Sequence, residues 1–488
     1  MILLIILLLP FITGLFLFLF RSPATIRILA LGSTIVNLLL TIYLIVSASS
    51  ADYSREWISC MGINFNLGFD GISLIMLILT NLLFPFIILS GFTRNQRQVA
   101  ILNFLILFTQ SALIGVFLAK NAFLFYIFWE LTLIPVYFIL LLWGGEDRRA
   151  ITLKFFIYTL TGSLFLLFGI IYLFQLTPGL HSTDFSAFNQ LKIPADTQTW
   201  LFWILFIAFA IKMPVFPFHT WQPSTYNMAS KQGVMILAGV MTKMGIYGAL
   251  RFLFPIIPAG VLYWQNLVII LCLTGVIYAS VIAFRQTNLK KLIAFSSMAH
   301  ISLMAAAMFA MNYYSTQGLL LQVISHGVTI VALFYLVTII NDRTATLELP
   351  QMGGLKHYAP NLAILLLMVV LGAVALPLTA GFVGEFLIIT GLFKLSVWYA
   401  LSGGMTMILG AIYMLYAYQR IMLGEKNRDF ENIGDVRTLD YVILIPLIAV
   451  ILVLGIYPQP VLNLIGDPMI TMQQLMIPVN NAIATLVQ

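Results

Sequence analysis

Long apolar stretches separated by short polar connections run along almost the whole chain. A hydrocarbon core about 30 Å thick takes about 20 helical residues to cross. Because lipid offers backbone polar groups no partner, such spans are α-helical. The pattern predicts fourteen spans, at 2–20, 26–47, 70–92, 99–119, 121–143, 152–174, 200–218, 232–254, 264–284, 289–311, 317–340, 361–390, 396–422 and 440–464.

The composition agrees with a chain that lies almost entirely in the membrane. Of 488 residues 61% are hydrophobic and 8% are charged, whereas soluble domains carry about 25% charged residues. No soluble domain is apparent, and the tail 467–488 is expected to lie along the interface. The predicted fold class is therefore an all-α polytopic membrane protein with about fourteen transmembrane helices.

The basic residues predict the orientation of these helices. Most of the 24 lysine and arginine residues lie in connections that follow odd-numbered spans. Cationic connections stay on the cytoplasmic side, so both termini are expected to face outward. Apart from Lys212 and Lys243 inside spans, the exceptions are Arg55, Lys120, Lys192, Arg251 and Lys394.

Two spans, 200–218 and 361–390, contain a proline beside an ionisable residue, at Pro214 and Pro377. Proline removes a backbone donor and clashes with the preceding turn, so both helices are expected to break. Paired broken helices are typical of inverted-repeat transporters with an ion site near the midplane; two ordinary kinks are the alternative. The predicted division is N-terminal helices 1–98, a first five-helix repeat 99–254, an inverted second repeat 255–424, and a last helix with its tail at 425–488.

Four charged side chains lie more than one helical turn from either end of a span: Glu130, Lys212, Lys243 and Glu385. Each costs about 2.5–3.5 kcal/mol at the centre of a helix on the insertion scale, so together they indicate a path for protons or small cations. Burial disfavours the charged form and an opposite charge favours it, which makes Glu130 the expected partner of Lys212. A neutral buried acid and a lysine that snorkels to the interface are the alternatives.

His300 and His326 stand on two consecutive predicted helices, each in a polar stripe. Histidine titrates nearest neutral pH, and such stripes suit water-filled, proton-conducting interiors. Axial ligation of a haem and a purely structural hydrogen bond between helices are the alternatives. The other members of the stripes are Ser296, Ser297, Gln322, Ser325 and Thr329.

Other chemically notable residues have simpler explanations. Asp70 stands at the start of a span, where an N-cap is expected. His219 follows the break at Pro214 and is placed at a cytoplasmic mouth. Cys60 and Cys272 form no CxxC motif, so no zinc or iron–sulfur site is predicted.

Several of these residues stand in motifs that resemble the antiporter-like subunits of proton-pumping NADH:quinone oxidoreductase, respiratory complex I. The resemblance covers nearly the full chain, and the family has relatives in multisubunit sodium/proton antiporters and membrane hydrogenases. The motifs are Trp129-Glu130-Leu131 with Pro135, Lys212-Met213-Pro214 with His219 and Trp221, Lys243-Met244-Gly245 with Tyr247-Gly248, the run from Lys290 to His300, and Gly381-Phe382-Val383-Gly384-Glu385-Phe386.

The resemblance implies fourteen core helices in two inverted five-helix repeats. It implies proton transfer by Glu130, Lys212, Lys243 and Glu385, with His300 and His326 linking the halves. It also implies that this chain holds no cofactor, since FMN, the iron–sulfur clusters and quinone belong to partner subunits. Of the three paralogues it favours the one with glutamate where Glu385 stands and without a long lateral helix.

One segment departs from the family pattern. After Trp221 the family usually has Leu-Pro-Asp-Ala-His, whereas this chain has Gln222, Pro223, Ser224, Thr225 and Tyr226. The missing acid and histidine put a proton-entry role for 222–231 in doubt.

The predicted function is outward proton translocation driven by redox energy from other subunits. The expected location is a bacterial cytoplasmic membrane, and the expected neighbours are other membrane subunits, above all antiporter-like ones. The first alternative is a subunit of a sodium/proton antiporter or membrane hydrogenase of the same superfamily. The second is a passive scaffold.

Overall fold

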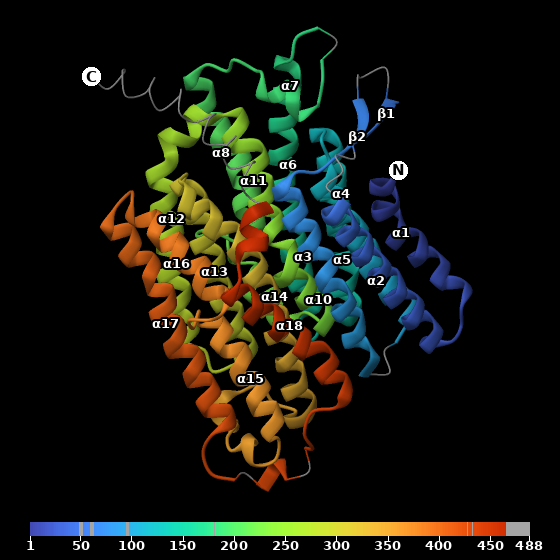
Figure 1. Ribbon diagram of the computed structural model, residues 1–488, viewed down its shortest axis with the longest axis vertical. Helices are drawn as coiled ribbons and strands as arrows, with labels where there is room; N and C mark the ends of the chain where they lie inside the picture. Colours follow the sequence, from blue (N-terminus) through green and yellow to red (C-terminus); the bar gives the residue numbers. More distant parts are fainter. Residues whose placement is uncertain are drawn as a thin grey trace. The chain divides into compact units, whose positions relative to one another are not determined.

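The computed structural model is almost entirely helical (Figure 1). Among the residues it describes, twelve helices are long and apolar enough to cross a membrane. The chain forms two compact units: the first unit comprises Met1–Met213 with Val240–Asn266, and the second comprises Pro214–Gly239 with Leu267–Asn463. The described residues are 1–47, 52–58, 63–93, 97–179, 181–426, 428–431 and 433–464.

The first unit is built from helices that follow the expected spans closely. Within it α1 packs against α4, α2 against α3, and both α6 and α11 against α8. Its helices are α1 (Ile2–Phe16), α2 (Pro23–Ser47), α3 (Gly71–Ser90), α4 (Val99–Leu118), α5 (Ala122–Trp143), α6 (Arg148–Leu176), α7 (Phe185–Asn189), α8 (Ala195–Lys212) and α11 (Lys243–Ile256).

A β-hairpin in the first unit was not predicted. Strand β1 (Tyr53–Ile58) pairs antiparallel with β2 (Ile63–Leu67). Asn66, in β2, donates to Asp184 Oδ1 at 2.9 Å. The connection between the second and third spans therefore has regular structure, and the fold is helical with this one small exception among the described residues.

The second unit contains the remaining helices. Within it α16 packs along α14, and α13 packs against both. Its helices are α9 (Gln222–Met228), α10 (Lys231–Ile236), α13 (Leu289–Ala310), α14 (Tyr313–Thr344), α15 (Pro360–Ala373), α16 (Ala380–Phe393), α17 (Val397–Met422) and α18 (Thr438–Ile456), and α12 (Pro258–Arg285) contributes residues to both units.

Both predicted helix breaks are confirmed. Helix α8 ends at Lys212, and the next helix begins at Gln222. Helix α15 ends at Ala373, and α16 begins at Ala380. Proline alone does not cause the breaks, because α3 and α5 each contain an internal proline and remain continuous.

The span expected at 232–254 runs from Lys231 to Ile256. A π-helical turn, Leu237–Met241, interrupts its α-helical pattern. The count of fourteen spans, the inverted relation of the repeats and the boundaries 99–254 and 255–424 stay predictions. The tail expected at 467–488 on the interface lies outside the described residues.

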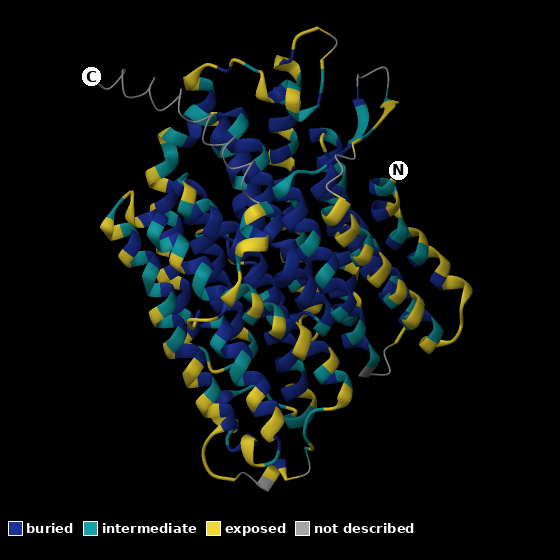
Figure 2. Cartoon of the chain, in the orientation of Figure 1, coloured by how far each residue is buried: buried dark blue, intermediate teal, exposed yellow. Residues whose placement is uncertain are grey.

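Exposed residues follow one side of α2 and of α17 (Figure 2), and many of them are apolar. They include Leu39 and Tyr43 on α2 and Trp398, Leu401 and Ile408 on α17. An apolar exposed stripe on a long helix is what contact with lipid or another membrane subunit requires.

Polar side chains tie α2, α3 and α4 together inside the first unit. Asn81 donates to Thr41 Oγ1 at 2.7 Å, and Gln110 donates to Asn81 Oδ1 at 2.9 Å. All three are fully buried. In the membrane the alternative to such hydrogen bonds is an unpaired polar group in hydrocarbon.

Asn81→Ala should lower the free energy of unfolding by about 1–2 kcal/mol, because it removes both hydrogen bonds of Asn81 and leaves the buried amide of Gln110 without this partner. Thermal denaturation in detergent measures this as a lower midpoint. Leu39→Ala, at an exposed position of α2, is the control and should change little. Equal midpoints for both variants would contradict the stabilising role of Asn81.

Candidate functional site

The first group of charged residues joins α5 to the broken end of α8. Glu130, half-buried in mid-helix on α5, interacts electrostatically with Lys212 at the end of α8. Lys212 Nζ lies 5.1 Å from the centroid of the Trp129 ring, and Trp129 Nε1 donates to Ser163 Oγ at 3.2 Å. Glu130 and Lys212 thus interact through their charges, as the sequence predicts.

Lys243 begins α11 directly after the π-helical turn and Thr242. Helix α11 touches the end of α8 here: a Cβ on Gly245 would lie 2.8 Å from Phe209 O and 2.9 Å from Met213 N. Only glycine allows this approach. π-helical turns occur frequently at functional sites, and this one places Lys243 on a helix packed against the end of α8.

Neither lysine snorkels to the surface of the chain. Lys212 is 4% exposed and Lys243 is 0% exposed. A snorkelling lysine keeps its ammonium in water while only its stem is buried. Both ammonium groups instead lie inside the first unit, which removes the simplest structural explanation for them.

A second group of residues lies in the second unit, where α13, α14 and α16 meet. His300 Nδ1 is 2.7 Å from Glu385 Oε1, an ion pair when the imidazole is protonated. Gln322 Nε2 donates to the same carboxylate oxygen at 3.1 Å. Glu385 is 1% exposed, and its Oε2 has no hydrogen-bond partner among the residues that the structure describes. These contacts provide the polar environment that a buried carboxylate needs.

Glycine also allows close helix packing beside Glu385. A Cβ on Gly384 would lie 2.5 Å from Gln322 Oε1. Helix α16 can therefore approach α14 closely enough for the Gln322 amide to reach the carboxylate.

A cavity of about 20 Å³ is lined by His300 and Gln322, which contact Glu385, and by His326, whose ring centroid is 5.7 Å from that of His300. Ser297 Oγ and Thr329 Oγ1 are buried here and have no hydrogen-bond partner in the described part of the chain. The volume suffices for a water molecule, and several polar groups can hold it. The residues of the predicted polar stripes line the cavity, and we call them, with Glu385, the His300 cluster: Ser296, Ser297, His300, Gln322, Ser325, His326 and Thr329.

Haem ligation by the two histidines does not fit this geometry. A porphyrin would have to lie between the rings, where the cavity measures only about 20 Å³, and His300 Nδ1 is directed at Glu385. Among the described residues no group of three or more His, Cys, Asp or Glu side chains is placed to hold a metal ion. Cys272 is buried in α12, and Cys60 lies outside the described residues.

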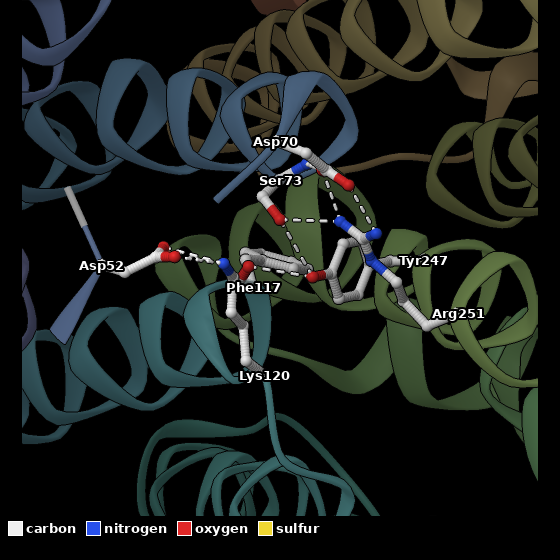
Figure 3. A network of polar contacts seen from close by, with 7 residues as sticks. All are labelled: Asp52, Asp70, Ser73, Phe117, Lys120, Tyr247 and Arg251. Carbon is white, nitrogen blue, oxygen red and sulfur yellow. Dashed lines mark hydrogen bonds and ion pairs between the residues drawn. The ribbon is translucent and has the colours of Figure 1, made fainter. Parts of the chain in front are cut away.

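Asp70 has the predicted capping role and a second one that the sequence did not reveal. It accepts from Ser73 N at 3.0 Å as the N-cap of α3, and it also binds the Arg251 guanidinium in two places (Figure 3). Burial raises the pKa of Asp70, but the charge and hydrogen bonds of Arg251 and the hydrogen bonds from Ser73 outweigh it, so the pKa lies below its ordinary value. From the sequence alone, Arg251 is only one of the basic residues near the end of a span.

His219 does not lie at an open mouth. Its ring stacks on Phe216 at 5.7 Å and contacts Tyr278 edge-on at 5.1 Å, and the side chain is buried. The departing segment 222–231 forms α9 and the start of α10, and its role in proton entry is untested.

Buried acids and bases beside broken membrane helices define the class of ion-translocating membrane proteins. The family described as NADH:quinone oxidoreductase/Mrp antiporter, TM, matches residues 119–413, and the chain belongs to this family.

Individual relatives agree. A protein of Rickettsia conorii named NADH-quinone oxidoreductase subunit M is 35% identical over 93% of this chain and 95% of its own length. A protein of Rhodobacter capsulatus with the same name is 37% identical over 90% of this chain and 88% of its own length. A chain of the structure "Respiratory complex I from Thermus thermophilus with bound NADH" superposes with a TM-score of 0.90 at 27% identity, covering 98% of this chain and 100% of that chain. The paralogue favoured by the sequence is the one called subunit M, or chain 4, so this prediction is confirmed.

Gly384→Val should disrupt the His300 cluster, because the added side chain would displace Gln322 from Glu385. We expect loss of at least about 1–3 kcal/mol of stability and loss of ion translocation in the assembled complex. Gly404→Val on α17 is the matched control, since a Cβ there meets nothing within 4 Å. Equal activity and melting of the two variants would show that the close packing at Gly384 is dispensable.

Proposed function

We propose that this chain translocates protons as the antiporter-like membrane subunit of an NADH:quinone oxidoreductase. One observation carries the proposal: a fully buried lysine, Lys243, lies on a helix packed against the broken end of α8, where Lys212 interacts with Glu130 of α5. Burying two ammonium groups this deeply costs free energy. A role in proton transfer accounts for that cost.

In the first unit, transfer proceeds by exchange of partners. While Glu130 is ionised, its charge stabilises the protonated form of Lys212. When Glu130 is protonated or moves away, Lys212 loses this stabilisation and releases its proton toward Lys243. Because the groups interact, they titrate as a coupled set rather than one by one.

In the second unit the His300 cluster provides groups of another kind. The imidazole of His300 has two ring nitrogens that can take part in proton transfer, and Glu385 is its ionic partner. The hydroxyl groups around the cavity can hold a water that connects His300 with His326. His300, His326 and Glu385 thus carry protons through the second unit.

The proposed setting follows from the charge pattern and from the relatives. Both termini face outward, and the cationic connections face the cytoplasm of a bacterium. Energy arrives from partner subunits that hold FMN, iron–sulfur clusters and the quinone site, and the immediate neighbours include other antiporter-like subunits.

A subunit of a sodium/proton antiporter is the second candidate, because the family includes Mrp antiporters. The native assembly distinguishes the two. NADH dehydrogenase activity and iron–sulfur absorbance in the purified complex support the first function. Their absence, together with exchange driven by an ion gradient alone, supports the second.

Glu130→Gln and Lys243→Ala should each lower NADH-driven proton pumping by about tenfold or more, because each removes a proton acceptor from the path. Pumping is measured in membrane vesicles that contain the assembled complex. Lys192→Ala, at an exposed position, is the control for removing a cation. Normal pumping at normal assembly in both interior variants would refute the proposal and favour a passive scaffold.

A further inference from the structure

Three residues on α11 lead from the buried lysine to the surface of the first unit. Lys243, Tyr247 and Arg251 are spaced four residues apart, so they lie above one another on one helix face. Lys243 and Tyr247 are buried, whereas the side chain of Arg251 is 22% exposed. The line of these three side chains along α11 is therefore the path by which a proton on Lys243 would reach the surface of this unit.

Aromatic rings fill this route between Lys243 and Arg251. The ring of Tyr247 contacts Phe117 edge-on at 5.1 Å and stacks with Phe125 at 6.3 Å between centroids. The guanidinium of Arg251 lies 5.0 Å from the centroid of the same ring. All three rings are buried, so the layer is apolar except for the Tyr247 hydroxyl.

The hydrogen bonds of this layer end where no proton can pass (Figure 3). Tyr247 donates to the carbonyl oxygen of Phe117 at 2.9 Å, so the Ser73 hydroxyl donates to Tyr247, at 3.1 Å. Arg251 donates to Ser73 Oγ at 2.9 Å, and a guanidinium does not give up its proton. The chain of hydroxyls thus starts at a permanent cation and stops at a backbone carbonyl.

Asp70 is not available as a proton carrier either. Its two oxygens accept from Arg251 at 2.5 and 2.6 Å, and its pKa lies below the ordinary value. It stays ionised near neutral pH, and bidentate binding holds the guanidinium in place. Arg251 is therefore a fixed positive charge at the end of the route.

We propose that Arg251, held by Asp70 and backed by Tyr247, seals this end of α11 against protons. A fixed arginine charge in a narrow passage repels protons and other cations. This inference rests on the proposed role of Lys243. The seal prevents a proton that reaches this lysine from escaping along α11. In the proposed orientation this end faces outward, where an opening would dissipate the gradient.

The alternative is that the same contacts only clamp α11 to α3. The two roles make different demands. A clamp depends on the Asp70–Arg251 bond, whereas a seal depends on the arginine charge itself. Asp70→Asn removes the negative charge of Asp70 and keeps the arginine. Arg251→Met removes the positive charge and keeps much of the side-chain volume.

The experiment measures passive proton flux in liposomes that contain the purified, assembled complex, without NADH. The decay of an imposed pH gradient is followed with an enclosed pH-sensitive dye. Arg251→Met should raise the protein-dependent flux about tenfold, which corresponds to a barrier lowered by about 1.4 kcal/mol. Asp70→Asn keeps the cation and an oxygen that accepts from it, so this variant should raise the flux much less than Arg251→Met. Lys120→Met is the matched control, because Lys120 forms an exposed ion pair with Asp52 in the same unit.

A double variant tests whether the leak passes through Lys243. Arg251→Met combined with Lys243→Ala should return the flux to the wild-type value. The seal is refuted by an assembled Arg251→Met complex that does not leak, by Asp70→Asn leaking equally, or by a leak that survives Lys243→Ala. Should Arg251→Met not assemble, Arg251→Gln, which keeps hydrogen-bond donors toward Asp70, serves the same test. NADH-driven pumping by Lys243→Ala alone tests the proposed function separately.

Discussion

A charge inside a bilayer has to find its counter-charge and its hydrogen bonds within the protein, and the structure is organised around this constraint. Lys212 is matched by Glu130 and lies over the ring of Trp129. Glu385 is matched by His300 and by the amide of Gln322. The first arrangement lies at the broken end of α8, and the second depends on Gly384, which lets α16 approach Gln322 of α14. The constraint therefore accounts for where helices break and where glycines stand.

The breaks show that proline is a contributing cause and not a sufficient one. Pro135 lies inside α5 five residues after Glu130, yet that helix continues. Between α15 and α16 two residues other than glycine, Ala375 and Leu378, have φ values of 54° and 75°. Such backbone is strained by about 1–3 kcal/mol per residue and persists only where surrounding contacts enforce it. Strain of this kind beside the helix of Glu385 is consistent with a site whose geometry matters more than its local stability.

Much of this could be predicted from the sequence, because the bilayer simplifies the problem. Apolar stretches predicted the helices, and the charges inside those stretches indicated Glu130, Lys212, Lys243 and Glu385 as candidate site residues. The polar stripes on α13 and α14 gave the lining of the cavity, since residues three and four apart share a helix face. The particular partners within those stripes did not follow from spacing alone: His300 meets Glu385 only because Gly384 allows α16 to lie against α14.

What was missed depends on contacts between residues far apart in the chain. The bond between Asp70 and Arg251 joins positions 181 residues apart, and each residue alone has an ordinary explanation. The hairpin of β1 and β2 lies in a connection, where hydropathy carries little information. The π-helical turn before Lys243 has no distinct sequence signal, because it is set by how α11 packs against α8. A four-residue spacing from Lys243 to Tyr247 to Arg251 was visible in the sequence, but without Asp70 it had no meaning.

The choice of cation at each end of α11 then follows from chemistry. A lysine can lose its proton when it is buried, and an arginine cannot. In the proposed mechanism Lys243 binds and releases protons at the buried end, and Arg251 provides a permanent charge at the end near the surface. Exchanging the two would give an inert cation inside and a base that releases protons near the exterior. The order of the two residues along one helix is thus the order that a one-way path demands.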